Sequence, residues 1–462
     1  MSVAGIARTQ TPELATDRHA ARTRSWTDIA TVASVPLLAL IICVAATKTY
    51  CLVPESERPL PTALAGPLRY LGFSVPPAVA IGLIAVLTFA YVFAARIATR
   101  VSFRTVVIAV AAFNVIVLLG PPLFSTDVFS YQAYAQMLTT YHANPYTNGP
   151  IVMILNQTLY PLIGAKWINT PSVYGPLFTL ASAGLGNATV PVSEFTFKTI
   201  AALSSGGTLF LIWRAAKLRG VNQSRAVAVF GLNPLITLYG VGGGHNDLLM
   251  LLLTTAGIYA LLIRRDATSA ASFVAGAAIK LTGAVLLPFA LANGSGTPGI
   301  SARRRRFMIG AAVTAVVIAI PSFIVFGTGV LKMSSTLESV QAQGQWQSIP
   351  GFFMNIFGHG ETRGVLSGVA VVLVAVALVL MRRVWQGRMD WLLAGGWVTF
   401  GLLATAGSLL PWYVSWLFPI VALTSSRRLW NAGVAMTLIA TLMTVVTYLP
   451  HGIPLLNIHS VG

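Results

Sequence analysis

Residues 124–134 read FSTDVFSYQAY, and this polar segment directly follows an apolar run that ends in PPL. Ser125 or Thr126 is suited to cap a helix, and Asp127 would then lie in its first turn, where the helix dipole favours a carboxylate. At about 100° per residue, one helix face would carry Asp127, Tyr131, Tyr134, Leu138 and Tyr141. That face is a carboxylate followed by three phenols, and we expect the segment to stop at the proline of residues 144–146.

Two interpretations fit this segment. A carboxylate fixed beside an aromatic wall suits general-base chemistry on a hydroxyl group. The alternative is an interfacial aromatic helix with a capping aspartate, which is common at membrane surfaces. The residues around the segment decide between the two.

The composition is that of a polytopic membrane protein. Of 462 residues, 55% are hydrophobic and only 9% are charged, whereas soluble domains carry about 25% charged residues. The net charge of +18 would suit nucleic acid, but the basic residues are distributed as a membrane topology requires. Cys43 lies within an apolar run and Cys51 just beyond it, so we expect neither a disulfide nor a metal–thiolate site.

Apolar length places the membrane spans, and Lys and Arg residues orient them. Residues 1–28 form a cytoplasmic tail, because three arginines precede a 29–47 run that is long enough for a retained anchor. Three arginines between the runs 77–97 and 105–123 make that turn cytoplasmic, so the segment after residue 123 is external. Further spans are expected at 195–213, 226–241, 248–263, 307–326, 364–381, 391–410, 414–424 and 430–449.

Two apolar pieces do not fit as ordinary spans. Residues 174–186 are short and glycine-containing, and a crossing there would put the following arginines outside, so we expect a surface helix. Residues 124–194 then form one large external catalytic loop. Residues 270–292 have basic residues on both flanks, and both flanks should be cytoplasmic. We therefore expect this stretch to enter the membrane and return to the same side as two half-length helices, with Lys280 near the turn.

The predicted fold is therefore an all-α bundle of about 13 transmembrane or half-length helices. It forms a single domain over residues 1–462, with the N-terminus inside, the C-terminus outside and a second external loop at 327–363. In this topology 22 Lys and Arg residues lie inside and seven outside, and Lys280 is the thirtieth. The basic excess thus follows from orientation and contact with anionic lipid, and no nucleic acid is needed.

The external face collects the candidate binding residues. Residues 242–247 read GGGHND, a run whose backbone N–H groups could approach an anion, although a tight turn is the plainer interpretation. His245 and Asp247 are too few for a convincing metal site and could instead hold a phosphate or orient a substrate, with Asn246 between them. Lys280 is costly in an apolar stretch unless it meets an anion or a carboxylate, or snorkels to water.

Aromatic side chains complete this set. Trp412, Tyr413 and Trp416 lie at the outer turn between two spans, where they form an aromatic belt or contact the C–H edges of a sugar. One carboxylate base with cationic partners fits transfer to a hydroxyl from a phosphate-linked donor. A phosphate leaving group needs no acid, unlike glycoside hydrolysis with its two carboxylates.

These residues give the chain a family resemblance. The matching stretches are STDVFSY at 125–131, NPY at 144–146, YGPL at 174–177, GGHND at 243–247, the Lys280 hairpin and, more weakly, LPWY at 410–413. The chain resembles the polyprenyl-phosphate-sugar-dependent glycosyltransferases of the C-type (GT-C) superfamily. It is most similar to the α-(1→6)-mannosyltransferases that extend lipomannan and lipoarabinomannan in the cell envelope.

The resemblance implies a role for each part. Asp127 would be the catalytic base, and residues 174–177 would start a juxtamembrane helix. The donor would be polyprenyl-phosphate mannose, used on the outer face of the plasma membrane with inversion to an α-mannoside. The acceptor would be a mannosylated lipid or glycan. Many C-type enzymes have two adjacent acidic residues here, but Thr126 precedes Asp127, so a divalent metal is not favoured.

The remaining assignments follow from this picture. Arg363 could pair with the donor phosphate, or it simply closes a span at the interface. Lys280 and His245 are the other candidates for the phosphate, and Tyr131, Tyr134 and Tyr174 join the aromatic residues as substrate contacts. A transferase for another polyprenyl-linked sugar, such as arabinofuranose or glucose, is one alternative. A lipid-linked sugar flippase is the other, but the distinctive polar motifs gather on one side of the membrane.

Overall fold

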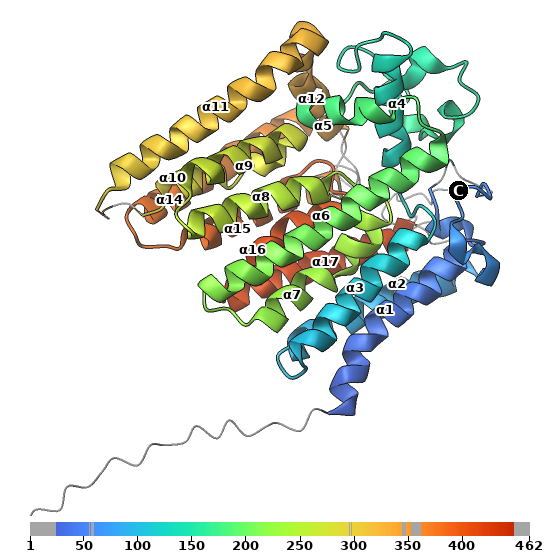
Figure 1. Ribbon diagram of the computed structural model, residues 1–462, viewed down its shortest axis with the longest axis horizontal. Coiled ribbons are helices and arrows are strands. Elements are labelled where there is room, and N and C mark those ends of the chain that lie inside the picture. The colour runs from blue at the N-terminus through green and yellow to red at the C-terminus, as the bar shows by residue number, and fades with distance from the viewer. Residues whose placement is uncertain are drawn as a thin grey trace, which may run out of the picture.

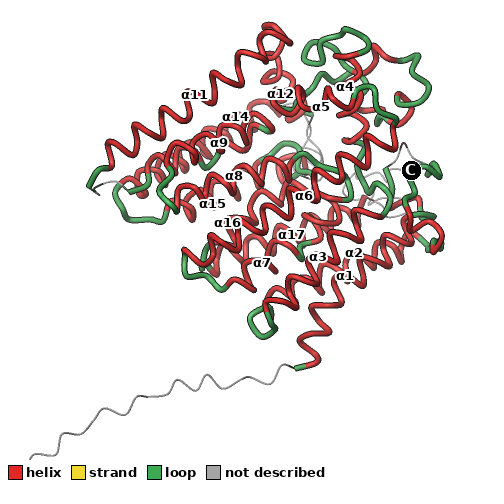
Figure 2. Tube along the Cα trace, viewed as in Figure 1, coloured by secondary structure: helices red, strands yellow, loops and turns green. Residues whose placement is uncertain are grey.

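The computed structural model describes residues 25–54, 56, 60–294, 296, 298–343, 348–352 and 362–447, with backbone only for 362–363 and 445–447. Within these residues all regular secondary structure is helical and there is no strand, as Figure 2 shows. The all-α fold class expected from the sequence is therefore confirmed for the described part of the chain.

The first three long helices form one packed group. They are α1 (Trp26–Ala46), α2 (Pro77–Ile97) and α3 (Phe103–Leu119), and α1 packs against both of the others. Ser25 and Ser102 cap α1 and α3, since each side chain accepts a backbone N–H of the first turn. The helix α3 ends four residues before the predicted boundary, because the two prolines after Gly120 cannot continue it.

The loop that follows α3 contains only short helices. They are α4 (Asp127–Thr139), α5 (Pro176–Ser182) and 3-10 turns at Pro150–Met153, Tyr160–Leu162, Ala165–Trp167 and Ala183–Leu185. The short helix expected after residue 174 is confirmed. The prediction for Tyr141 is wrong, because α4 ends at Thr139 and leaves this residue beyond the face that Asp127 and the other two tyrosines share.

The next helices turn back through the body of the molecule. They are α6 (Val190–Leu218), α7 (Gln223–Gly231), the π-helix η8 (Leu235–Val241) and α8 (Asp247–Leu262). Residues 226–241 were expected to be one span, but α7 and η8 meet at an angle of 44°. Pro234 lies at this break, and the side chain of Asn233 accepts the backbone N–H of Leu235 in place of a helical bond.

The predicted hairpin of half-length helices is present. The helix α9 (Asp266–Ile279) stops at Lys280, which is extended, and η9 (Leu281–Ala284) and α10 (Leu287–Ala292) follow. The rest of the chain supplies α11 (Ile300–Phe326), η10 (Gly327–Lys332), α12 (Met333–Ala342), α14 (Thr362–Trp385), α15 (Trp391–Thr405), η11 (Pro411–Leu417), α16 (Phe418–Leu423) and α17 (Arg427–Thr447). Much of the second external loop, residues 344–347 and 353–361, lies outside the described residues.

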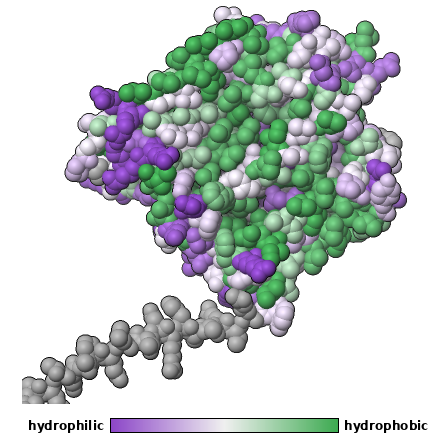
Figure 3. Space-filling view, in the orientation of Figure 1, coloured by the Kyte–Doolittle hydropathy of each residue, from purple (hydrophilic) through white to green (hydrophobic). Residues whose placement is uncertain are grey.

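The helices have the character of membrane spans. Five described helices are long and apolar enough to cross a membrane, or six if α7 and η8 count as one bent span. Large apolar side chains of α11 and α14 are exposed, and Figure 3 shows hydrophobic side chains over much of the helical body. This supports a polytopic membrane protein, whereas the number of 13 spans and the orientation of the termini stay predictions.

The two ends of the helical body carry different groups: the 124–194 loop lies at one end and exposed arginines lie at the other. Figure 1 shows α4 and α5 near the end of α11 that adjoins α12, and the start of α11 at the opposite end of the body. The exposed arginines Arg305 and Arg306 lie at that opposite end, where Figure 3 shows a hydrophilic patch. The polar loop 124–194 is thus far from the arginine-rich end, as the predicted topology requires.

Candidate active site

Asp127 lies at the first position of α4, after a strained turn. Phe124 has a φ of +61°, a region that residues other than glycine rarely adopt. The turn is held because Phe124 donates its N–H to the carbonyl of Leu52 and stacks on Tyr239 with ring centroids 4.3 Å apart. Ser125 Oγ then accepts the N–H of Asp127 at 3.2 Å. The backbone of Asp127 and the turn that precedes it are therefore both held in place.

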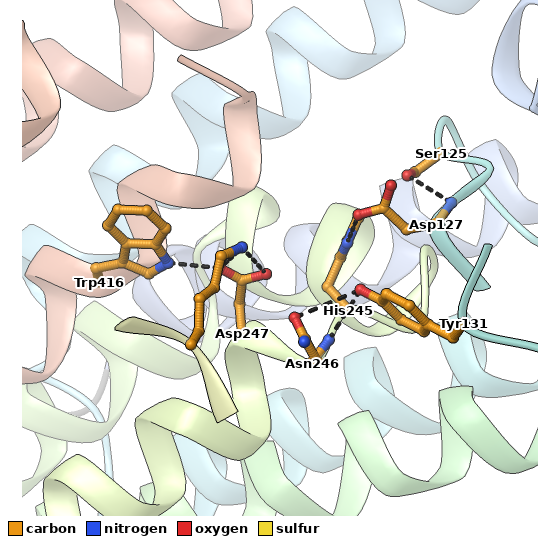
Figure 4. A network of polar contacts seen from close by, with 8 residues as sticks. Ser125, Asp127, Tyr131, His245, Asn246, Asp247 and Trp416 are labelled. Atoms are coloured by element: carbon orange, nitrogen blue, oxygen red, sulfur yellow. Dashed lines mark hydrogen bonds and ion pairs between the residues drawn. The ribbon is translucent and has the colours of Figure 1, made fainter. Parts of the chain in front are cut away.

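His245 holds the carboxylate of Asp127 from behind. Its Nδ1 lies 3.1 Å from Oδ2 of Asp127, and its side chain is fully buried. A dashed line in Figure 4 marks this contact. The imidazole stacks on Trp412 with centroids 3.9 Å apart. The turn that carries the histidine needs glycine, since Gly244 has a φ of +61° and a Cβ at Gly242 would lie 2.2 Å from a backbone oxygen.

Burial is the largest influence on the pKa of Asp127 and raises it. His245 lowers this pKa by hydrogen bonding and by charge, and Lys280 and the Ser125 hydroxyl lower it further. Together these groups hold the pKa of the Asp127 carboxyl below its ordinary value. The carboxyl is therefore ionised at neutral pH, which is the state that a base requires.

A second polar centre surrounds Asp247, whose side chain is 1% exposed. Its two carboxylate oxygens lie 2.8 and 2.9 Å from Nζ of Lys280, and the indole N–H of Trp416 donates to one of them at 2.6 Å. The ammonium of Lys280 also lies over the rings of Tyr413 and Trp416, at 4.3 and 5.3 Å. Lys280 thus has the carboxylate partner that an apolar stretch requires.

Tyr131 links the two centres from the inside. Its hydroxyl lies 3.4 Å from both the side-chain oxygen and the backbone nitrogen of Asn246, between His245 and Asp247 in the chain. Its ring makes edge contacts with Tyr174, Phe178 and Phe197 at centroid distances of 4.8, 4.8 and 5.3 Å. The aromatic contacts join α4 to α5 and α6, and the hydroxyl of Tyr131 joins α4 to the residue that precedes α8.

A cavity of about 430 Å³ opens beside both centres. One part of its wall is polar and comes from the 124–194 loop and from the Lys280 hairpin. The other part is apolar and comes from α12, α14 and α15, with Leu337, Val340, Leu366, Val369, Leu373 and Leu402. A ligand that joins a polar head to a long apolar tail would match these two parts of the wall.

The predicted site residues fall into two layers. Asp127, Tyr134, Tyr174, Lys280, Tyr413 and Trp416 line the cavity. Tyr131, His245, Asn246, Asp247 and Trp412 are not part of its wall and contact the first group or one another from behind. The side chain of Arg363 lies outside the described residues, so its assignment stays a prediction.

Sequence reasoning missed several cavity residues. Ser130, Trp167, Thr170 and Thr282 line the same cavity. Ser130 had a usable signal, because it is three positions after Asp127 on α4 and so close to the same helix face. Trp167 had none, since its distance of 40 residues from Asp127 is closed only by the folding of the loop.

Metal ligands do not gather in this region. Among the described residues, no group of three or more His, Cys, Asp or Glu side chains is arranged to hold a metal ion. His245 and Asp247, the pair weighed as ligands from the sequence, are each engaged with a different partner.

Comparison with known proteins adds the family. A family model described as "Alpha-(1->6)-mannopyranosyltransferase, N-terminal domain" matches residues 35–294. The chain is 27% identical over 340 residues to "Alpha-(1->6)-mannopyranosyltransferase A" of Mycobacterium tuberculosis, covering 67% of this chain and 64% of that protein. It is 25% identical over 370 residues to a "Probable alpha-(1->6)-mannopyranosyltransferase" of Mycolicibacterium smegmatis, covering 70% of this chain and 66% of that protein.

A shorter match has a slightly higher identity. It is 30% over 177 residues to "Alpha-(1->6)-mannopyranosyltransferase A" of Corynebacterium glutamicum, covering 36% of this chain and 34% of that protein. The chain thus spans a little under two thirds of the length of the mycobacterial and mycolicibacterial relatives named above. No solved structure matches the chain.

Proposed function

Because the chain belongs to the α-(1→6)-mannopyranosyltransferase family, we propose that it transfers mannose from polyprenyl-phosphate mannose to a mannosylated lipid or glycan. The new linkage is α-(1→6), and it forms with inversion of the β-linked donor. The reaction takes place on the outer face of the plasma membrane, within lipomannan or lipoarabinomannan synthesis. Nucleic acid is not a partner, and the chemistry needs no divalent metal.

One observation carries this proposal: the Asp127 carboxylate faces a cavity whose wall is polar on one side and apolar on the other. A polyprenyl chain fits the apolar wall of α12, α14 and α15, because burial of its methyl and methylene groups is favourable. The sugar and phosphate of the donor then lie against the polar wall, beside Asp127 and Lys280. A water-soluble nucleotide sugar would leave the apolar wall unused.

Asp127 acts as the base. As the acceptor hydroxyl oxygen forms a bond to C1 of the donor mannose, the bond from C1 to the phosphate oxygen breaks. The hydroxyl proton passes to the Asp127 carboxylate, and polyprenyl phosphate leaves. A carboxyl with a lowered pKa is a weak base, so the proton moves late, when the attacking oxygen has become acidic through bond formation.

Lys280 stabilises the leaving phosphate. Asp247 and the two aromatic rings fix its ammonium at the cavity wall, where it offsets the charge that develops on the phosphate oxygens. The donor is already a phosphate ester, so no general acid is needed. His245 is a positioning residue, because it contacts the Asp127 carboxylate and is absent from the cavity wall.

The stereochemistry of the product tests the proposal. Purified protein in liposomes would receive polyprenyl-phosphate β-mannose and a short α-(1→6)-mannoside, and the product would be analysed by NMR. An α-(1→6)-linked product supports the proposal. A β-linked product contradicts inversion. If the protein transfers only arabinofuranose or glucose from the corresponding polyprenyl-phosphate donors, the assignment of mannose is overturned. If the donor moves from one leaflet of the liposome membrane to the other without any transfer, the protein is a flippase.

A further inference from the structure

Two residues of the cavity wall, Ser130 and Trp167, have no part in the mechanism above. Both belong to the 124–194 loop, and both line the cavity that Asp127 lines. Neither lies on α12, α14 or α15, which form the apolar wall. They therefore belong to the part of the wall that the 124–194 loop supplies, together with Asp127.

Ser130 offers an unused hydroxyl. Its side chain is 3% exposed, and its Oγ has no hydrogen-bond partner among the residues that the structure describes. Many serines in a helix donate to the carbonyl four residues back, but this one does not. A buried hydroxyl without a partner is unfavourable, so a ligand group that hydrogen-bonds it would be stabilised there.

Trp167 is half-buried, and its backbone is anchored. It ends the 3-10 turn Ala165–Trp167, and its backbone N–H donates to the carbonyl of Gly164 at 2.7 Å. Gly164 lies against the N-cap of α4, since a Cβ there would be 3.0 Å from the hydroxyl oxygen of Thr126. The hydroxyl of Tyr134 donates to the carbonyl of Thr170 at 2.8 Å, so both flanks of the tryptophan are attached to α4.

The donor leaves only one side free for the acceptor. In an inverting displacement the attacking oxygen and the leaving phosphate lie on opposite sides of C1. The phosphate is attached to the polyprenyl tail along the apolar wall, so the acceptor hydroxyl reaches Asp127 from the side of the 124–194 loop. This step rests on the function proposed above.

We infer that Ser130 and Trp167 form the acceptor subsite and bind the mannosyl residue that carries the attacking 6-hydroxyl. The ring of Trp167 packs against the C–H edges of this sugar. The hydroxyl of Ser130 hydrogen-bonds one of its hydroxyl groups, three positions along α4 from the base. The two residues therefore determine which acceptor is used, whereas Lys280 and the apolar wall determine the donor.

The test measures the Michaelis constants for acceptor and donor separately, together with the hydrolysis of donor by water when no acceptor is present. Trp167→Ala is expected to raise the acceptor KM about ten-fold or more, and Ser130→Ala about three- to ten-fold. Trp167→Phe should restore most of the acceptor affinity. Donor KM and donor hydrolysis should change less than about two-fold, because the subsite does not contact the donor.

Two control variants match these changes. Ser193→Ala removes another buried serine hydroxyl without a partner among the described residues, but this one is on α6 and outside the cavity wall. Trp26→Ala removes an exposed tryptophan at the start of α1. Both controls should keep the acceptor KM of the wild type.

The outcomes separate this inference from the proposed function. Transfer by the wild type with an unchanged acceptor KM in Trp167→Ala and Ser130→Ala overturns the subsite and leaves the proposed function intact. Equal increases in acceptor KM and donor KM, with lower donor hydrolysis, indicate a general distortion and also overturn the subsite. No transfer by the wild type overturns the proposed function and this inference with it.

Discussion

Replacing Lys280 by methionine should strongly destabilise the protein. The change removes the ammonium but keeps the length of the side chain. Among the described side chains, the Asp247 carboxylate then keeps only the Trp416 N–H as a partner. Asp247 is 1% exposed, so water cannot replace the missing cation. Breaking a buried ion pair by removing one partner costs about 3–5 kcal/mol, and we expect about 3 because the indole N–H remains.

Replacing Asp247, the other member of the ion pair, distinguishes the loss of stability caused by an unpaired charge from the loss caused by altered packing. Asp247→Asn leaves Lys280 unpaired, but this side chain is 14% exposed at the cavity and reaches water, so the loss should be smaller, about 1–2 kcal/mol. The double variant buries no unpaired charge. Its loss should therefore be smaller than the sum of the two single losses, with a coupling of about 1–3 kcal/mol.

Equilibrium unfolding in mixed detergent micelles, followed by tryptophan fluorescence, measures these losses. Lys332→Met is the control, because this lysine is exposed at the end of η10. The reasoning is refuted if Lys280→Met is as stable as the control. It is also refuted if the two single losses simply add in the double variant.

Three further variants test other parts of the account. Burial raises the pKa of Asp127 and His245 lowers it, so His245→Ala should raise this pKa and move the acid limb of the kcat/KM profile to higher pH; an unmoved limb contradicts the role of His245. Gly175→Ala should lower the thermal unfolding midpoint and reduce activity several-fold, because its Cβ would lie 2.1 Å from a carbonyl oxygen of α9. Gly184→Ala is the control, since its Cβ meets nothing within 4 Å, and equal unfolding midpoints of the two variants would refute the prediction. Lys198→Met removes a buried ammonium that pairs with Glu194 and binds two carbonyls just after α3. The buried Glu194 carboxylate loses its partner, so the change should cost about 3–5 kcal/mol in the same unfolding assay, and a wild-type midpoint would contradict these contacts.

Apolar length predicted much of the fold. The boundaries of α2 and the starts of α8, α14 and α15 agree with the expected spans within a few residues, because these runs have abrupt polar or glycine flanks. The bend between α7 and η8 was not predicted. Its cause, Pro234, lies inside an otherwise apolar run, and apolar length alone does not reveal a break.

The site could be predicted only in part. Asp127 and Lys280 were recognisable because a charge beside or within an apolar run needs a reason. His245 and Asp247 were also candidates, but their pairing was not predicted, since His245 is 118 positions from Asp127 in the chain and Asp247 is 33 from Lys280. Pairing at such distances depends on how helices pack, which residue types and spacing do not encode. Trp167 was missed for the same reason.

The central claim is that Asp127 is the base, and one measurement tests it most directly. Transfer of labelled mannose from polyprenyl-phosphate mannose to a short α-(1→6)-mannoside would be compared in the wild type and in Asp127→Asn, with donor binding measured on both. The account predicts transfer by the wild type, a loss of about 100-fold or more in the variant, and retained donor binding. Full activity in Asp127→Asn would contradict the claim and return α4 to an interfacial aromatic helix.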